Sequence, residues 1–211
     1  MKITKIGHCC LIVETKGVKI LTDPGMFTEA QNQVTNVDLV LITHEHGDHL
    51  HMESVKAIIQ NNPKVKIITN QSVGRLLAAE NIPFEIVEHG QMQNFNGVLI
   101  EGYGNKHHEI FREYGMVQNT GYYIDDTFFY PGDALFNPQK TPALLAMPAP
   151  FGWANMKEVI SYVLEIGPKK CFMVHDSSIK RKAFILNVVN EYFPQANIEF
   201  IDTEDGAMLE L

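Results

Sequence analysis

The alternation of apolar and polar positions predicts a first half made mainly of short strands. The run at 37–42 is apolar at almost every position, which is typical of a strand buried on both faces. Helical spacing appears around Val55, Ile58 and Ile59, and again over 72–80. Strands are expected at residues 3–6, 9–15, 18–22, 37–42, 65–68 and 82–87.

The second half repeats this order, with strands first and alternating strands and helices afterwards. Turn signals stand at Asn96-Gly97, Asp125-Asp126 and Pro131-Gly132. A capping-box pattern, Asn155-x-x-Glu158, opens a helix that should stop near Gly167-Pro168. Strands are expected at 98–103, 127–130, 171–174, 198–201 and 208–211, and a last helix at about 179–192.

The two halves contain no flexible linker or low-complexity segment between them. We therefore predict one domain, residues 1–211, built of two similar α/β halves. Because strands and helices are mixed in both halves, two packed sheets with helices outside are the favoured arrangement. The pattern leaves the topology open.

Composition and charge narrow the class of protein. Apolar residues make up 45% of the 211 residues and charged residues 20%, which is ordinary for a folded domain and argues against disorder or a coiled coil. Seventeen basic against 25 acidic residues give a net charge of −8, so a general nucleic-acid partner is not expected. Since no apolar run would span a bilayer and the first residues lack the apolar stretch of a signal peptide, we expect a cytoplasmic protein without a membrane partner.

The candidate chemistry lies in a cluster of histidines. The three cysteines have no metal-binding spacing and are interpreted as apolar core residues. In contrast, His44, His46, Asp48 and His49 follow the buried run at 37–42. Imidazole and carboxylate groups bind Zn²⁺, Mn²⁺ and Fe²⁺, and residues two apart on an extended chain point the same way. His44 and His46 can therefore share one ion, and Asp48 and His49 can face a second.

The motif His-x-His-x-Asp-His resembles the signature of the metallo-β-lactamase fold superfamily. Residues 7–13 and 20–24 resemble the opening hairpin and the Asp-Pro turn of that family, and the later matches are His107 or His108, Gly132-Asp133 and His175. The resemblance implies an α/β fold, a four-layer αββα sandwich of two mixed β-sheets flanked by helices.

The resemblance also implies a set of metal ligands and catalytic groups. The first ion is assigned to His44, His46 and His107, the second to Asp48, His49 and His175, and Asp133 is expected to bridge them. His107 is preferred to its neighbour His108 because it stands closest behind the strand at 98–103, and the choice between the two stays open. Asp48 and Asp133 are the expected catalytic carboxylates. The expected cofactor is a pair of divalent ions, Zn²⁺ first, with Mn²⁺ or Fe²⁺ as alternatives.

The leading functional hypothesis is a dinuclear metal-dependent hydrolase in which a bridging hydroxide attacks a small ester, lactone or related substrate. An anionic substrate group would suit the net positive charge of two ions beside two carboxylates and a hydroxide. The alternatives are a metal-dependent phosphodiesterase or nuclease, and a non-catalytic metal-binding protein of the same fold. The expected partner is a small molecule, and homo-oligomer formation is left open.

Departures from the family patterns favour one of its branches. His46 stands where the di-iron redox members carry a carboxylate, which disfavours redox chemistry. Residues 50–54 differ from the Gly-rich continuation of the thioester hydrolases. The early Gly7-His8 and the Pro-rich segment 147–153 are similar to the compact branch of predicted metal-dependent hydrolases that includes ascorbate-6-phosphate lactonase.

Several further residues receive provisional roles. Asp23 is expected to accept a hydrogen bond from a ligand histidine. His8 is either a residue next to the ligands or a buried structural histidine. Trp153 is a candidate pocket wall, and the basic residues Lys106 and Arg112 are candidates for holding a substrate anion.

Overall fold

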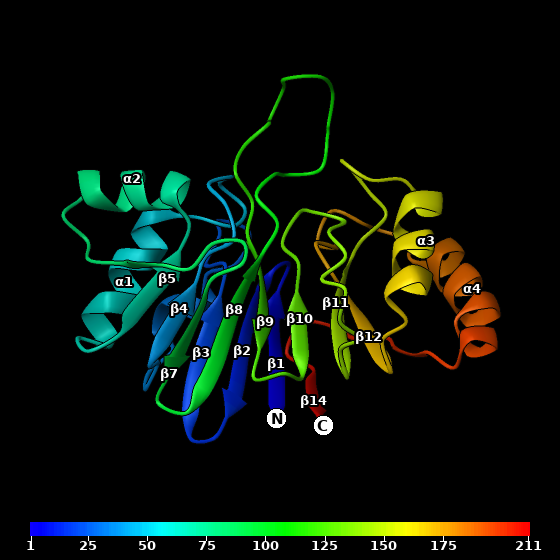
Figure 1. Ribbon diagram of the computed structural model, residues 1–211, viewed down its shortest axis with the longest axis horizontal. Helices are drawn as coiled ribbons and strands as arrows, with labels where there is room; N and C mark the ends of the chain where they lie inside the picture. The colour runs from blue at the N-terminus through cyan, green and yellow to red at the C-terminus, as the bar shows by residue number, and fades with distance from the viewer.

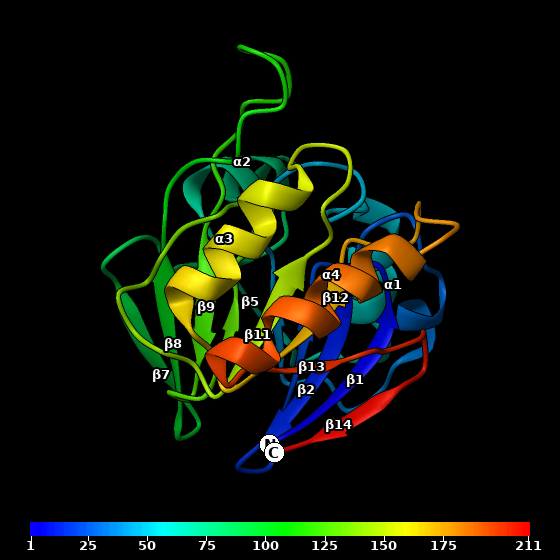
Figure 2. The same cartoon turned by 90° about the vertical axis from the view of Figure 1, so that its right-hand side faces the viewer.

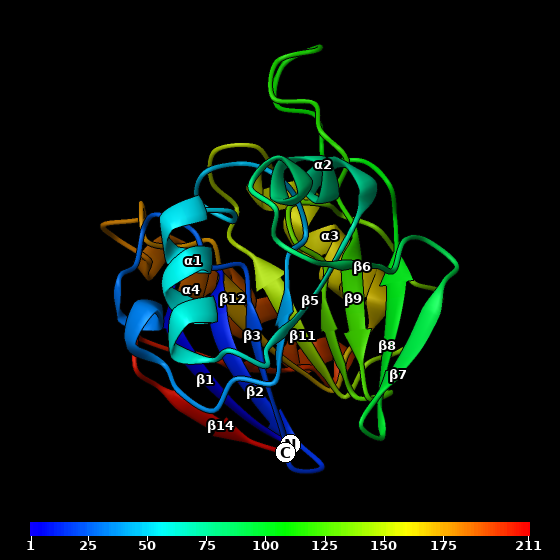
Figure 3. The same cartoon turned by 90° about the vertical axis from the view of Figure 1, so that its left-hand side faces the viewer.

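Two seven-stranded β-sheets pack face to face, and the helices lie on their outer faces (Figure 1). The computed structural model describes residues 1–211. Helices α1 (Met52–Asn61) and α2 (Gln71–Ala79) cover the first sheet (Figure 3), and α3 (Met156–Ile166) and α4 (Ala183–Tyr192) cover the second (Figure 2). This arrangement confirms the expected αββα sandwich.

The first sheet has the strand order β14-β1-β2-β3-β4-β5-β6. Its strands are β1 (Lys2–Gly7), β2 (Cys10–Thr15), β3 (Val18–Thr22), β4 (Leu39–Leu41), β5 (Lys66–Thr69), β6 (Glu85–Ile86) and β14 (Met208–Glu210). Strands β14, β1, β2 and β3 are antiparallel, whereas β3 to β6 run parallel. Short 3-10 helices occupy Ala30–Gln33 and Pro194–Ala196.

The second sheet repeats the same plan, with the order β13-β12-β11-β10-β9-β8-β7. Its strands are β7 (Met92–Phe95), β8 (Val98–Tyr103), β9 (Gly121–Ile124), β10 (Phe128–Tyr130), β11 (Leu144–Pro148), β12 (Lys170–Val174) and β13 (Glu199–Ile201). Strands β7 to β10 are antiparallel and β10 to β13 are parallel. Each sheet thus combines an antiparallel part and a parallel part.

Apolar side chains fill the three spaces between the four layers. Twenty buried residues form the cluster between the sheets, where Leu41 of one sheet and Phe172 of the other are fully buried. A cluster of 18 buried residues lies under α3 and α4, and one of 12 lies under α1 and α2. Strand β4 contributes to both faces of its sheet, as its unbroken apolar run predicts.

Local capping signals place the helix ends. The Asn155 side chain accepts a hydrogen bond from the Glu158 backbone, and the Glu158 side chain accepts one from the Asn155 backbone. Gly167 ends α3 in the left-handed conformation at φ 61°, which glycine adopts without the steric cost of a Cβ. Both ends of this helix confirm the sequence-based prediction.

Several predicted elements are shorter than expected, among them the strand predicted at 37–42, which is reduced to Leu39–Leu41. The strand predicted at 82–87 is reduced to Glu85–Ile86, because Pro83 has no backbone N–H to donate to a neighbouring strand. The helix predicted from residue 179 begins at Ala183 instead. Asp176 holds the residues just before this helix in a turn. Its carbonyl oxygen accepts a hydrogen bond from Ile179 N–H, and its side chain accepts one from the Lys182 ammonium group.

The two chain ends lie side by side (Figure 2). Strand β14 pairs with β1 through Ile3 and Leu209, so the last strand of the chain forms the edge of the first sheet. Among the helices, none combines the length and the apolar character needed to cross a membrane.

Candidate metal centre

The predicted motif forms the loop that follows β4. Leu50 N–H and His49 N–H both donate to the His46 carbonyl oxygen, at 2.8 and 2.9 Å, which makes a tight turn of this loop. The Gly47 carbonyl oxygen accepts a hydrogen bond from Met26 N–H at 2.9 Å. The four polar side chains of the motif are thereby held at the end of a buried strand.

One group of imidazoles gathers His44, His46 and His107. The candidate ligand nitrogens of these three residues all lie within 4.8 Å of one another. His44 and His107 are buried, and His46 is half-buried. The structure thus brings His107 into the group predicted for the first ion.

A second group gathers around the carboxylate of Asp48. His175 Nε2 lies 3.2 Å from Asp48 Oδ2, and His49 Nε2 lies 3.8 Å from the same oxygen. These are the partners predicted for the second ion. His8 joins them, with its Nε2 at 3.1 Å from Asp48 Oδ2.

Asp133 lies between the two groups. Its Oδ2 is 3.0 Å from His175 Nε2, 3.4 Å from His107 Nε2 and 4.0 Å from His44 Nε2. Its Oδ1 is 3.2 Å from His49 Nε2. One carboxylate therefore reaches histidines of both groups, which is the position expected of a bridging ligand.

The buried polar atoms of this site lack partners within the protein. His44 Nε2, His49 Nε2, His107 Nε2 and Asp133 Oδ1 are all buried without a hydrogen bond. Leaving such an atom unsatisfied costs about 1–3 kcal/mol, so four of them in one place need an external partner. A cation that accepts imidazole and carboxylate ligands satisfies these atoms, and the residues present therefore fit divalent metal ions.

The outer nitrogens of His49 and His44 are fixed by oxygen acceptors. Asp23 Oδ2 is 2.7 Å from His49 Nδ1, and it also accepts from Thr43 Oγ1 at 2.7 Å and from the Tyr130 hydroxyl at 2.6 Å. Because Thr43 Oγ1 donates to Asp23, it can accept from His44 Nδ1, which lies 3.0 Å away. These hydrogen bonds leave each Nε2 lone pair facing the site.

The electrostatics of the site favour a positive charge. Burial alone would raise the pKa of Asp133, but His49 and His175 beside it hold that pKa well below the usual range. Burial would lower the pKa of His49, but the charge of Asp133 raises it well above the ordinary value. The field around Asp133 therefore stabilises cations.

Comparisons with known proteins agree with this architecture. Residues 2–168 match the family model described as the beta-lactamase superfamily domain. The chain belongs to this superfamily. Among relatives, Protein Rv0786c of Mycobacterium tuberculosis is 27% identical over 184 residues, 85% of each chain. A UPF0173 metal-dependent hydrolase of Aeropyrum pernix is 36% identical over 83 residues, 37% of this chain and 34% of the relative.

Two solved structures share the fold. Igni18, a metallo hydrolase from Ignicoccus hospitalis, has a TM-score of 0.79 and 18% identity over 100% of this chain and 98% of its own. CmlA, a diiron β-hydroxylase from Streptomyces venezuelae, has a TM-score of 0.77 and 14% identity over 100% of this chain and 54% of its own. These two likenesses concern the fold alone. The matched family, the His/Asp cluster and the relatives that are named metal-dependent hydrolases together support the conclusion that this chain is a metal-dependent hydrolase.

The structure separates the two neighbouring histidines whose roles the sequence left open. His108 N–H donates to the Asp133 carbonyl oxygen at 2.8 Å, but its Nε2 lies 3.8 Å from Glu158 Oε1, outside the metal centre. Its side chain is 27% exposed. The ring of Trp153 packs near both, at 5.5 Å from His108 and 5.7 Å from His107, so Trp153 does form a wall beside this centre.

The candidate anion-binding residues lie in different places. Lys106 lines a hollow of about 290 Å³ together with His107, His108 and Leu135, beside the first imidazole group. Arg112 lies in the loop between β8 and β9, which projects from the sandwich (Figure 1), and its guanidinium stacks 5.2 Å from the Phe111 ring. Lys106 thus lines a hollow beside the first imidazole group, whereas Arg112 is exposed on the projecting loop.

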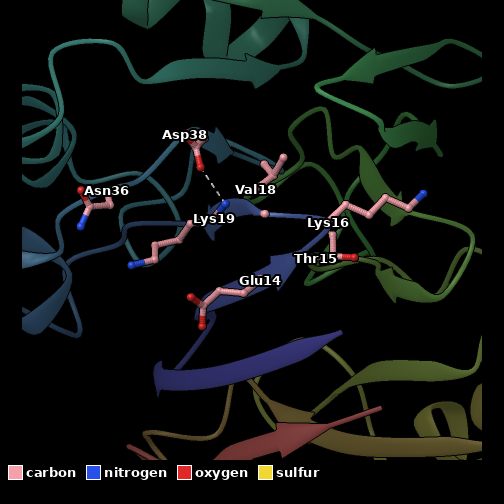
Figure 4. A pocket seen from close by; sticks show the side chains of 8 residues that line it. Glu14, Thr15, Lys16, Val18, Lys19, Asn36 and Asp38 are labelled. Atoms are coloured by element: carbon pink, nitrogen blue, oxygen red, sulfur yellow. Dashed lines mark hydrogen bonds between the residues drawn. The ribbon is translucent and has the colours of Figure 1, made fainter.

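A second hollow, of about 450 Å³, lies elsewhere, at the turn between β2 and β3 (Figure 4). Asp38 accepts a hydrogen bond from Lys19 N–H there at 2.8 Å. The remaining lining residues are Glu14, Thr15, Lys16, Gly17, Val18 and Asn36. Asp38 thus supports the chain between strands and takes no part in the metal centre.

Cys9 and His8 also lie at the candidate metal centre, although the sequence did not assign either of them as a ligand. Cys9 Sγ lies in one group with His49 and Asp133, and burial raises the pKa of its thiol, which favours the predicted packing role over a metal-binding thiolate. His8 lies at the turn between β1 and β2, directly beside Asp48. Its sequence signal was the Gly7-His8 pair, but its distance to Asp48 depends on the order of strands β1 to β4 in the first sheet.

Replacement of Asp23 by Asn is expected to weaken metal binding by about 10–100-fold, because the amide cannot accept from His49, Thr43 and Tyr130 as the carboxylate does. Competition with a chromophoric chelator measures this change. Asp38→Asn is the matched control, since Asp38 also accepts a backbone hydrogen bond but lies away from the centre. An Asp23→Asn protein with wild-type metal affinity would contradict the role assigned to this carboxylate.

Proposed function

We propose that this protein is a dinuclear metal-dependent hydrolase acting on a small ester, lactone or related substrate. The observation that carries the proposal is the position of Asp133, whose two oxygens lie within 3.0 to 4.0 Å of histidines from both ligand groups. The first ion is assigned to His44, His46 and His107, the second to Asp48, His49 and His175, and Asp133 to both.

The protein residues supply binding, orientation and charge. A pair of divalent ions held there would lower the pKa of a water molecule to near neutrality and stabilise the developing oxyanion. Asp133 fixes the separation of the two ligand groups and offsets positive charge in both. Asp48 is the carboxylate at the more open side, with 21% of its side chain exposed against 3% for Asp133. Asp48 would therefore be the carboxylate more accessible to an attacking water.

The surroundings favour a small substrate. The hollow of about 290 Å³ beside His107 is lined by Leu135 and Phe136 as well as by Lys106. Its charged lining residues are Lys106 and Glu109, so the size and the apolar part of the hollow suit a compact molecule, and the attraction for an anionic group would come from the metal ions. The net charge of −8 opposes a long nucleic-acid substrate.

The test combines metal content with a substrate panel. Protein reconstituted with Zn²⁺, Mn²⁺ or Fe²⁺ is analysed for metal and assayed on lactones, simple esters and a generic phosphodiester. We expect close to two ions per chain and hydrolysis of lactones or esters in preference to the phosphodiester. Folded protein that holds no metal in a metal-replete buffer would overturn the proposal. Preferential phosphodiester cleavage would overturn the substrate class.

A further inference from the structure

His8 is built into the centre in the same way as the histidines assigned as ligands. Its side chain is 2% exposed, and its Nε2 lies 3.1 Å from Asp48 Oδ2. His175 Nε2 approaches that same oxygen at 3.2 Å. The Phe27 ring packs edge-on against the His8 ring at 4.8 Å, so apolar contact holds the imidazole in place.

The backbone of His8 is held in an unfavourable conformation. Its φ is 50°, and His175, which donates its N–H to the His8 carbonyl oxygen at 3.1 Å, has a φ of 61°. Histidine adopts this left-handed region rarely, and such residues cluster at functional sites. His8 and His175, which lie next to each other in space, therefore both have a left-handed backbone, and both direct Nε2 toward Asp48.

The outer nitrogen of His8 also has an oxygen partner. Ser177 Oγ lies 2.8 Å from His8 Nδ1. The same construction occurs at His49, whose Nδ1 lies 2.7 Å from Asp23, and at His44, whose Nδ1 lies 3.0 Å from Thr43. An acceptor on Nδ1 turns the Nε2 lone pair of an imidazole toward a metal ion.

The spacing of the inner atoms suits one ion. Ligand atoms of His8, Asp48, His49 and His175 all lie within 4.8 Å of one another. Bonds of about 2.0–2.2 Å to one ion place neighbouring ligand atoms roughly 3.0–3.4 Å apart, and the distances to Asp48 Oδ2 are 3.1, 3.2 and 3.8 Å. We propose that His8 is a further ligand of the second metal ion, an inference that rests on the dinuclear centre proposed above.

The experiment compares two variants that separate a ligand from a hydrogen-bond donor. His8→Gln can still donate a hydrogen bond to Asp48, but its amide oxygen is a much weaker ligand for Co²⁺ than an imidazole nitrogen. His8→Asn is too short to reach the ion, and asparagine tolerates the left-handed backbone. Co²⁺ is the probe, with its two affinities measured by chelator competition and its coordination followed by visible absorption.

Both variants are expected to weaken one of the two bound Co²⁺ ions by about 100-fold or more, since even outer partners of a ligand contribute about 10–100-fold. The visible absorption of that ion should change, while the affinity of the other ion stays within about twofold. Ser177→Ala should weaken the same ion by about tenfold. His89→Ala is the matched histidine control, because His89 packs against Phe136, outside the centre.

A His8→Gln protein with wild-type affinity and absorption would overturn the inference and leave His8 as a residue that positions Asp48 by hydrogen bonding. Circular dichroism and thermal unfolding establish that each variant is folded. Wild-type protein that binds fewer than two Co²⁺ ions would overturn the dinuclear proposal itself, and the ligand role of His8 at a second ion with it. The wild-type stoichiometry thus distinguishes the two failures.

Discussion

Replacing Asp133 by Ala is expected to remove the paired metal site and to lower kcat/KM by about 10³-fold or more. The carboxylate reaches His49 and His175 on one side and His107 on the other. Without it, both ligand groups lose a shared anionic ligand, and the repulsion between two divalent ions is no longer offset. Metal analysis should find at most one ion per chain, and steady-state kinetics on the best ester or lactone gives the loss of activity.

Two further variants make the Asp133 result specific. Asp133→Asn keeps the size of the side chain and one oxygen ligand, so it should bind metal better than Asp133→Ala but remain far below wild type. Asp126→Ala removes an exposed carboxylate that pairs with Lys140 at the surface and should leave both metal content and rate nearly unchanged. An Asp133→Ala protein with two ions and full activity would show that the bridging assignment is wrong.

The neighbours His107 and His108 are expected to give opposite results. His107→Ala should lose the first ion and about 10²–10³-fold in kcat/KM, because His107 Nε2 is buried and unpartnered within the first imidazole group. His108→Ala should retain two ions and hydrolyse an activated ester nearly normally. Any loss in His108→Ala should be confined to substrates with poor leaving groups, since a proton donor assists only those.

Metal analysis and a leaving-group series on both variants check this pair. The control is internal, because the two residues are adjacent, have the same side chain and differ only in where that side chain points. Metal loss in His108→Ala, with His107→Ala fully loaded, would exchange their roles. Equal slowing of good and poor leaving groups by His108→Ala would remove His108 as a proton donor.

Features that depend on neighbouring residues could be predicted from the sequence alone. The helix α3 begins at Asn155 and ends at Gly167 because its capping bonds and its left-handed end are made within a few residues. The loop from His44 to His49 is short, and it follows a strand whose apolar residues indicate that it is buried. The ligand types of that loop were therefore recognisable before any contact was known.

Only the tertiary structure decided which distant groups meet. The positions of His8, Asp133 and His175 at one point depend on the packing of two sheets, and the choice of His107 over His108 depends on which side chain the loop after β8 turns inward. Strand β14, at the end of the chain, pairs with β1, at its beginning. Sequence periodicity predicts which residues are buried, but it does not predict which residues far apart in the sequence lie close together in space. The local chemistry was thus determined by sequence, whereas the gathering of distant residues at one candidate metal centre was determined by non-local packing.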